Sequence, residues 1–245
     1  MKRTLLFFLF CLPIAVVAQN IQLHYDLGRT LYNDLNDRMR VTSTVEMFKA
    51  DKFGSTYFFV DIDYHSDGVK GAYWEVSREL NLTKNEQFAA HVEYDGGITS
   101  DRDALSSSRF QHVALVGGAW NWHSADYSRT FSLQALYRYC FNGKREWLKP
   151  YNSFQLTEVW NIDFCNRRYT FSGYCDLWYD RNVRGKWAIC SEPQFWFNFD
   201  TLKGLQDVHL SVGSEVELSY NFVYDDAGRC DKFRALPTLG MKWTF

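Results

Sequence analysis

The chain of 245 residues contains no run of ~18 or more consecutive apolar residues, which a helix needs to cross a bilayer, so a helical membrane protein is excluded. It also lacks a marked excess of either charge, with 27 Lys and Arg against 29 Asp and Glu, which predicts no nucleic-acid partner. No internal repeat, low-complexity tract or linker interrupts it, which favours one domain. The cysteine spacing fits no zinc site, and we expect neither a metal nor another cofactor.

The first 18 residues have the three parts of a secretory signal peptide. Lys2 and Arg3 precede an apolar run, which ends at a small-residue boundary closed by Ala18. A membrane anchor is the weaker interpretation, because the run is too short to cross ~30 Å of hydrocarbon as a helix and Pro13 interrupts it. We therefore predict that residues 1–18 are removed on export and that residues 19–245 form the mature domain.

Aromatic residues make up 18% of the chain, yet its mean hydropathy is −0.35. Strands that alternate lipid-facing and lumen-facing residues in a membrane barrel produce this combination. The segment 208–222 alternates almost throughout, with Val, Leu, Tyr and Phe on one face, mainly His, Ser, Gly, Glu and Asn on the other, and only Ser214 out of place. A soluble half-buried strand also alternates, but it is usually ~5–6 residues long. The length therefore favours a strand that crosses a bilayer.

The C-terminus repeats the pattern and ends on Phe245, with Trp243 on the same face. A final strand with alternating aromatics and a terminal Phe resembles the signal that the outer-membrane barrel assembly machinery reads. We therefore expect this machinery to be a partner, with Trp243 and Phe245 as the assembly signal. Pro237 departs from the pattern, because proline cannot donate to a sheet ladder.

The same alternation predicts twelve strands near 20–28, 40–49, 55–65, 69–82, 87–96, 109–122, 128–141, 151–162, 168–179, 186–199, 208–222 and 232–245. Mostly short connections alternate with mostly longer, charged ones, which predicts periplasmic turns, external loops and both termini in the periplasm. The predicted fold class is therefore all-β: a transmembrane antiparallel β-barrel of about 12 strands in outer-membrane lipid.

Strand parity also predicts which side chains face the lumen. The candidates for binding a solute are Phe59, Asp61, Asp63, Tyr73, Glu75, His91, Glu93, Trp178, Glu192, Trp196, Glu215 and Glu217, with Arg138, Arg234 and Lys242 as cations on the same face. An open lumen of this kind should carry a negative potential and weakly prefer cations. The carboxylates could instead brace the wall by pairing with Arg and Lys. Because an inward residue faces the pore, Arg should be tolerated at Ser211 or Gly213 but not at lipid-facing Val212 or Val216.

Two chemical alternatives involve one strand. His91, Glu93 and Asp95 share a face at a spacing of ~7 Å, which could hold a divalent cation, but such sets are common by chance and we predict no metal site. A histidine and an acid could also serve a serine hydrolase. No nucleophile motif accompanies them, so we predict no enzyme and no catalytic residues.

Three segments carry a family resemblance: Val41–Lys49, Gly54–Asp63 and Tyr73–Arg78. They resemble the Tsx-like nucleoside-specific channel group and a related uncharacterised outer-membrane family. The resemblance implies a narrow, monomeric, twelve-stranded pore for nucleosides or similar small solutes. It implies that bases lie between aromatic side chains such as Phe59, Tyr73, Trp178 and Trp196, while Asp61 and Glu75 bind the sugar.

The predicted function is thus an outer-membrane channel for small hydrophilic solutes, nucleosides among them by resemblance, through a narrow, acidic, aromatic-lined lumen. The alternatives are an outer-membrane barrel hydrolase and a soluble ligand-binding β-sandwich. Extraction of the protein from membranes distinguishes the soluble β-sandwich from the two barrel hypotheses. Conductance in planar bilayers distinguishes a channel from a barrel enzyme.

Overall fold

The computed structural model describes residues 19–245 apart from 67, 102–105, 110–111, 142–148 and 182–185. The predicted signal peptide, 1–18, lies outside these residues and stays a prediction. No helix in the described ranges is long and apolar enough to cross a membrane.

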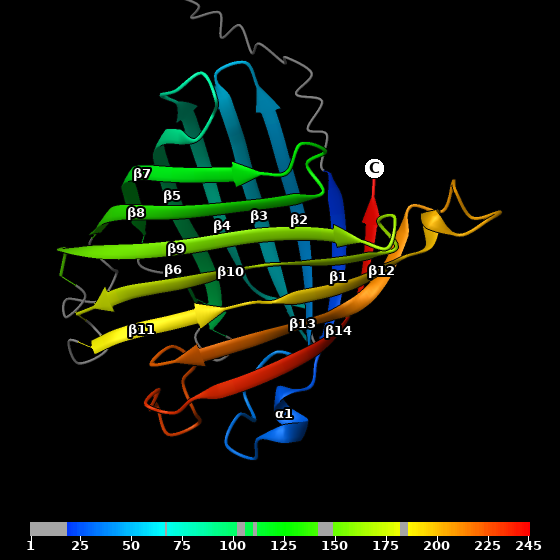
Figure 1. The fold of residues 1–245 in the computed structure, drawn as a ribbon. Coiled ribbons are helices and arrows are strands. Elements are labelled where there is room, and N and C mark those ends of the chain that lie inside the picture. Colours follow the sequence, from blue (N-terminus) through cyan, green and yellow to red (C-terminus); the bar gives the residue numbers. More distant parts are fainter. Residues whose placement is uncertain (1–18, 67, 102–105, 110–111, 142–148, 182–185) are drawn as a thin grey trace, which may run out of the picture.

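The described chain is almost entirely β-structure (Figure 1). Its strands are β1 (Asn20–Asp26), β2 (Val41–Asp51), β3 (Gly54–His65), β4 (Gly68–Asn81), β5 (Phe88–Asp101), β6 (Ser106–Arg109), β7 (Val113–His123), β8 (Arg129–Cys140), β9 (Tyr151–Phe164), β10 (Tyr169–Asp180), β11 (Lys186–Ser191), β12 (Gln194–Asn198), β13 (Leu210–Tyr220) and β14 (Arg234–Thr244). Its two helices are α1 (Gly28–Leu31) and the 3-10 helix η1 (Phe199–Thr201). Ten strands have 11 to 14 residues, enough for the ~9–11 residues that a tilted membrane strand needs.

All the strands belong to one antiparallel sheet that closes on itself, with β1 paired to both β2 and β14. Strands β11 and β12 both pair with β10 and β13 in one continuous register, so they form a single strand interrupted at Glu192 and Pro193. Strand β6 pairs only with β5 and prolongs one hairpin. Counting β11 and β12 as one and setting β6 aside, twelve strands close the barrel, which confirms the predicted fold class.

The interruption at Pro193 has a matching position on the neighbouring strand. Proline has no N–H for the ladder, and Gly173 on β10 faces it with a positive φ of 154°. A Cβ on Gly173 would lie 2.5 Å from the carbonyl oxygen of Glu192, closer than real contacts allow. Glycine at this point therefore lets the strand pass the proline without leaving the sheet.

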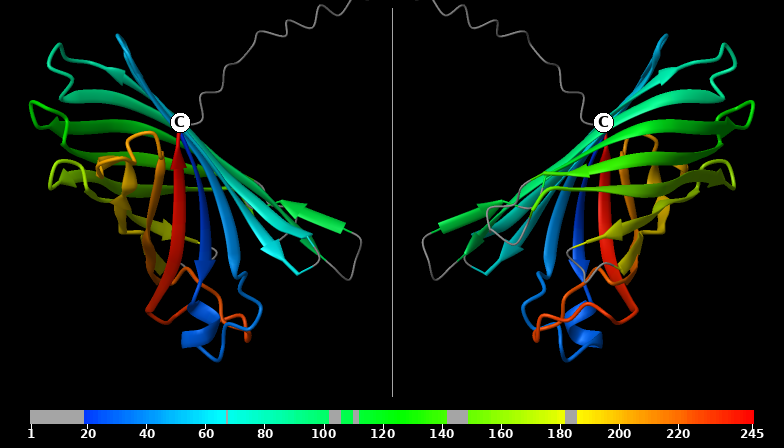
Figure 2. Two further views of the ribbon diagram at one scale, coloured as in Figure 1. Left: turned by 90° about the vertical axis from the view of Figure 1, so that its right-hand side faces the viewer. Right: turned by 90° about the vertical axis from the view of Figure 1, so that its left-hand side faces the viewer.

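The two ends of the barrel differ (Figure 2). Gln19 and Phe245 meet at one end, where the Phe245 N–H donates to the Gln19 carbonyl at 2.9 Å; we call this the terminal end. The opposite end, the α1 end, carries α1 and the loop 221–233. The expected asymmetry of short and long connections holds for most of the barrel, with the tight β3–β4 connection and the longer segment 199–209 as departures.

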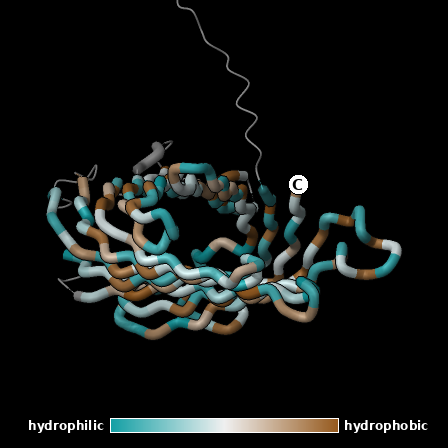
Figure 3. Tube along the Cα trace, turned by 45° about the horizontal axis from the view of Figure 1, so that its top comes forward, coloured by the Kyte–Doolittle hydropathy of each residue, from teal (hydrophilic) through white to brown (hydrophobic). Residues whose placement is uncertain are grey.

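Hydrophilic and hydrophobic residues alternate along many of the strands (Figure 3). Outward aromatic side chains gather in two bands. The band toward the α1 end includes Tyr25, Tyr94, Tyr137, Tyr179, Trp187 and Tyr220, and the band toward the terminal end includes Phe88, Trp120, Trp122, Phe164, Phe171, Phe195 and Trp243, all exposed. Two aromatic girdles are typical of outer-membrane barrels, because their rings settle at the two membrane interfaces. Glu158, exposed in the middle of β9, is a carboxylate within the outward face.

The inner face is acidic in part and apolar in part, whereas the sequence predicted an acidic, aromatic-lined lumen. One sector packs apolar side chains inward at the α1 end of β7 to β9: Val113, Leu115, Leu136, Cys140 and Tyr151. A second cluster joins Trp178, Ala188 and Cys190 on β10 and β11. Inward parity therefore fixes the direction of a side chain but not its contact with water.

The expectation that arginine is tolerated at Gly213 is also wrong. A Cβ on Gly213 would lie 2.1 Å from the carbonyl oxygen of Phe195 and 2.7 Å from the ring of Trp196. A Cβ on Gly240, which pairs with Gly213, would lie 2.9 Å from the same ring. The two glycines form a recess in the wall that the fully buried Trp196 fills. Ser211 is likewise closed to a large side chain, because it is only 6% exposed and donates to Asn198 at 2.7 Å.

Candidate functional site: the barrel lumen

Strands β3 and β4 place aromatic and acidic side chains side by side on the inner wall. The ring centroids of Tyr57 and Phe59 lie 6.1 Å apart, and those of Phe59 and Tyr73 lie 5.9 Å apart. The Tyr73 hydroxyl donates to Glu75 at 2.7 Å, and Asp61 accepts from the Thr44 hydroxyl at 2.5 Å. All these side chains stay partly accessible to water, so the wall offers rings and carboxylate oxygens together.

A second acidic group lies where β4 meets β5. Glu75, Glu93 and Asp95 each place one oxygen within 4.8 Å of the other two. His91, only 2% exposed, contacts Glu93 at 3.1 Å with Nε2 and Glu79 at 3.2 Å with Nδ1. The structure thus brings together three predicted site residues, Glu75, His91 and Glu93, which the sequence had placed on two separate strands.

The opposite wall, from β10 to β13, is acidic as well. Asp176 accepts from the Thr157 hydroxyl at 2.5 Å, and Glu215 accepts from the Gln194 amide at 2.6 Å. Glu192 lies close enough to Glu215 and Glu217 for the three charges to repel one another. Because Tyr174 projects among Glu192, Asp176 and Glu75, this wall repeats the combination of ring and carboxylates.

The lumen is narrow at the level of these groups. Glu75 on β4 and Asp176 on β10 lie five strands apart around the ring of twelve, yet each lies within the other's electrostatic field. Asp61 on β3 likewise adds negative potential at Glu215 on β13. Carboxylates therefore face one another across the lumen, and their fields add in its centre.

Few cations oppose this charge. Arg38 reaches in from the β1–β2 loop and pairs with Asp26 at 2.8 Å and Glu217 at 2.7 Å. Lys242 lies over the Trp196 ring at 4.3 Å, and Arg138 donates to the sulfur of Cys140 at 3.0 Å. The third predicted lumen cation, Arg234, is bound instead to Asp34 at the α1 end.

Not every predicted site residue presents a surface to the lumen. Trp196 is fully buried in its glycine recess, with His24 at 5.8 Å between ring centroids. Trp178 is 7% exposed and packs edge-on against Phe222 at 5.5 Å. Asp63 accepts from the Thr42 hydroxyl at 2.7 Å and stays partly accessible to water. The aromatic surface of the lumen is therefore that of Tyr57, Phe59, Tyr73 and Tyr174 rather than of Trp178 and Trp196.

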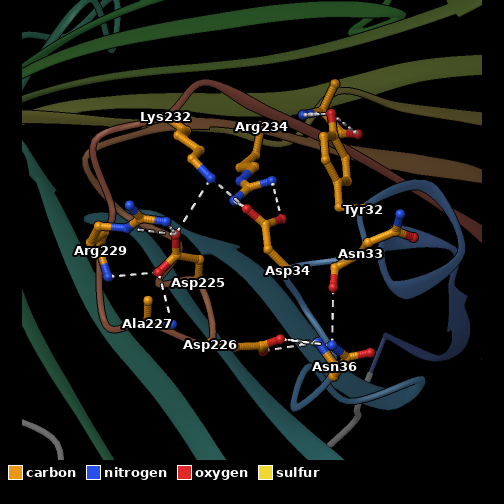
Figure 4. A network of polar contacts seen from close by, with 11 residues as sticks. Tyr32, Asn33, Asp34, Asn36, Asp225, Asp226, Ala227, Arg229, Lys232 and Arg234 are labelled. Carbon is orange, nitrogen blue, oxygen red and sulfur yellow. Dashed lines mark hydrogen bonds and ion pairs between the residues drawn. The ribbon is translucent and has the colours of Figure 1, made fainter.

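The α1 end is held by a network of polar contacts between the loops 27–40 and 221–233, which we call the loop clamp (Figure 4). Asp34 accepts from both guanidinium nitrogens of Arg234 at 2.9 Å and from Lys232 at 2.5 Å. Asn36 donates through its backbone and side chain to Asp226 at 2.9 and 2.8 Å. The clamp thus fixes the loop from which Arg38 enters the barrel.

Electrostatics support the loop clamp at neutral pH. Hydrogen bonds from Arg234 and Lys232 hold the pKa of Asp34 well below its usual range. The pKa of Asp225 is lowered to about 2, chiefly by the backbone N–H of Arg229 and also by its guanidinium. Both carboxylates therefore stay charged over the whole physiological range.

His91 is not paired with a serine nucleophile. Both ring nitrogens of His91 are engaged by carboxylates, so the ring is not paired with a hydroxyl that it could activate. Partly hydrated carboxylates and rings that face one another across a narrow passage can instead attract, orient and pass cationic or neutral solutes.

Sequence reasoning overlooked several lumen residues. Tyr57, Tyr174 and Glu46 share the inward parity of their strands and could have been found from it; Glu46 accepts from the Gln22 amide at 2.9 Å. Arg38 belongs to a loop, where no periodicity indicates which way a side chain points.

Comparisons with known proteins agree with this architecture. The profile of the family described as "Domain of unknown function (DUF5020)" matches residues 18–245. None of the curated proteins matches the chain in sequence. The solved NanC porin aligns with 92% of this chain and 99% of its own, at 11% identity and a TM-score of 0.56. The KdgM porin, alone and in complex with disordered oligogalacturonate, covers 92% of this chain and 98% of its own, at 11% and 12% identity and a TM-score of 0.46 in both cases. At such identity the likeness to the NanC porin shows the fold, and nothing in these findings extends to the Tsx-like group.

Proposed function

Because the chain belongs to this DUF5020 family and folds as a closed twelve-stranded barrel, we propose that it is an outer-membrane channel through which small hydrophilic solutes diffuse. The observation that carries the proposal is the partly hydrated acidic lumen, in which Glu75, Asp176 and Glu215 keep surface accessible to water inside a closed wall. The porin fold of the NanC structure supports it. The two aromatic girdles fit a barrel that sits in lipid as a single chain.

The same proposal covers export and assembly. Residues 1–18 are a cleaved signal peptide, the terminal end faces the periplasm, and the α1 end faces outward. Trp243 is exposed on the outer face and Phe245 pairs with Gln19 at the very end of the barrel. Both positions suit a signal that assembly machinery reads before the barrel closes.

The negative charge of the lumen determines which solutes we expect to pass. Carboxylates on both walls outnumber Arg38, Arg138 and Lys242, and fixed negative charge in a narrow pore enriches cations and repels anions. We therefore propose cationic and neutral solutes over acidic sugars or nucleotides. Nucleosides are the neutral class that fits best, since a base can stack on Phe59 or Tyr73 while Asp61 accepts from the ribose hydroxyls.

Conductance in planar bilayers tests this proposal. Under a KCl gradient the reversal potential should show preference for K⁺, and replacing Asp61, Glu192 and Glu215 together by their amides should reduce it. Uridine or adenosine should lower the current, and the corresponding nucleotides should do so less. Phe59→Ala should weaken the block, whereas Phe171→Ala on the lipid-facing side should leave it unchanged. Anion preference would contradict the lumen charge, and the absence of any conductance would refute the channel.

A further inference from the structure

The three acidic side chains where β4 meets β5 converge on one point, which side chains that only brace the barrel wall would not need to do. Glu75 and Asp95 are paired across the two strands, and Glu93 lies two residues from Asp95 on the same face. One oxygen of each lies within 4.8 Å of the other two, so three negative charges converge on one point of the inner wall. Like charges at this distance repel strongly in a protein interior, unless a proton or a cation lies between them.

Groups behind the cluster hold its carboxylates in place. Tyr73 donates to one oxygen of Glu75 at 2.7 Å, and His91 contacts one oxygen of Glu93 at 3.1 Å. His91 is itself held by Glu79, which accepts from Asn121 at 2.8 Å. One oxygen of Glu75 and one of Glu93 are thus held by groups outside the cluster. Fixing first ligands by outer partners in this way is characteristic of metal sites.

Asp95 provides a second, separate observation. Asp95 is only 6% exposed, and its Oδ1 has no hydrogen-bond partner among the described residues. Leaving a buried carboxylate oxygen unpaired is costly, so such an oxygen points to a ligand. The nearby guanidinium of Arg138 makes no hydrogen bond to this oxygen; it donates to the sulfur of Cys140, and its own Nε is likewise unpaired among the described residues.

We propose that Glu75, Glu93 and Asp95 bind a divalent cation, Ca²⁺, on the lumen wall. Carboxylate oxygens are the ligands that this hard cation prefers, and Ca²⁺ accepts irregular geometry with 6–8 oxygens. Glu75 and Glu93 keep part of their surface accessible to water, so water can complete the coordination. The bound ion cancels the repulsion within the cluster, and it leaves Asp61, Asp176, Glu192 and Glu215 to set the charge of the passage.

Terbium luminescence on the folded barrel in detergent micelles tests the site. Tb³⁺ substitutes for Ca²⁺, and the Tyr73 ring, bonded to Glu75, is positioned to sensitise it. We expect one saturable component at neutral pH that Ca²⁺ displaces. Asp95→Asn and Glu75→Gln should weaken its affinity at least tenfold. Tyr73→Phe should weaken it about tenfold, as loss of an outer partner does. Affinity is taken from the Ca²⁺ concentration that displaces Tb³⁺, because phenylalanine sensitises Tb³⁺ much less than tyrosine and the emission intensity of Tyr73→Phe therefore does not report affinity.

The matched control is Asp163→Asn, an inward carboxylate at the terminal end that accepts from Thr170 at 2.7 Å. It should bind as the unaltered protein does. The absence of saturable emission from the unaltered barrel, or emission that Ca²⁺ does not displace, would overturn the proposal, whatever the folding of the variants. Equal losses in Asp163→Asn and Asp95→Asn would overturn it too. The measurement needs no ion flow, so its failure is distinct from a failure of the channel proposal.

Discussion

Replacing Gly213 by alanine tests how the barrel wall holds Trp196. The new Cβ would lie 2.1 Å from the carbonyl oxygen of Phe195, whereas ordinary C···O contacts begin near ~3.3 Å. The two groups must therefore separate by about 1.2 Å, judged against that contact distance. Strands β12 and β13 are paired in register here, so the backbone cannot move at this point alone.

Trp196 cannot relieve the clash either. Its ring carbon Cε3 would lie 2.7 Å from the new Cβ, and the residue is fully buried between the glycines, His24 and Lys242. Overpacking of this kind costs about 1–3 kcal/mol, and contact with both backbone and ring places Gly213→Ala near the upper end. With a urea dependence of about 1–3 kcal/mol per molar, the midpoint of unfolding should fall by about 1 M.

The assay is urea unfolding of the barrel in lipid vesicles, followed by tryptophan fluorescence and by the mobility of unheated protein in gels. Gly118→Ala is the control, since that exposed strand glycine has only the Ala89 carbonyl oxygen near its Cβ, at 3.8 Å. It should be neutral or stabilise by about 0.4–1 kcal/mol. If the two variants unfold at the same urea concentration, Trp196 is not held as described, and its ring could then turn to the lumen.

Three further outcomes are expected. Val216→Arg should lower the free energy of unfolding in vesicles by about 2–4 kcal/mol. Tyr220→Arg, on the same outward face but at the membrane interface, should lower it by only about 0–1 kcal/mol. Equal losses would show that the position of β13 in the membrane is wrong. Deleting Phe245 should reduce the membrane-assembled fraction and increase periplasmic degradation, while Thr244→Ser should do neither. The stabilisation that Asp34 gives the loop clamp is fully present above its usual pKa of 3.8 and is lost as the pH falls from that value through the lower pKa of the folded protein. Asp34→Asn should therefore accelerate tryptic cleavage of the clamped loops at pH 7, and the unaltered protein should become sensitive to pepsin only as the pH falls to about 2 or below; resistance in both cases would contradict the clamp.

Much of the barrel could be predicted from the sequence, because a strand repeats its environment every two residues. The segment predicted at 208–222 is β13, Leu210–Tyr220, and Ser214 is outward as its parity required. Phe59, Glu75 and Glu215 lie on the inward face as predicted. Local chemistry was enough here, since the choice between lipid and lumen acts on each side chain separately.

The tertiary structure alone decided which inward side chains meet. The stagger of the strands on closure brings Asp95 beside Glu75 and faces Glu75 toward Asp176, and no periodicity of one strand contains that stagger. Closure also seals Trp196 behind two glycines and carries Arg38 into the mouth from a loop. The sequence thus determined the face of each residue, whereas its depth, its neighbours and its contact with water depended on how twelve strands close around one narrow space.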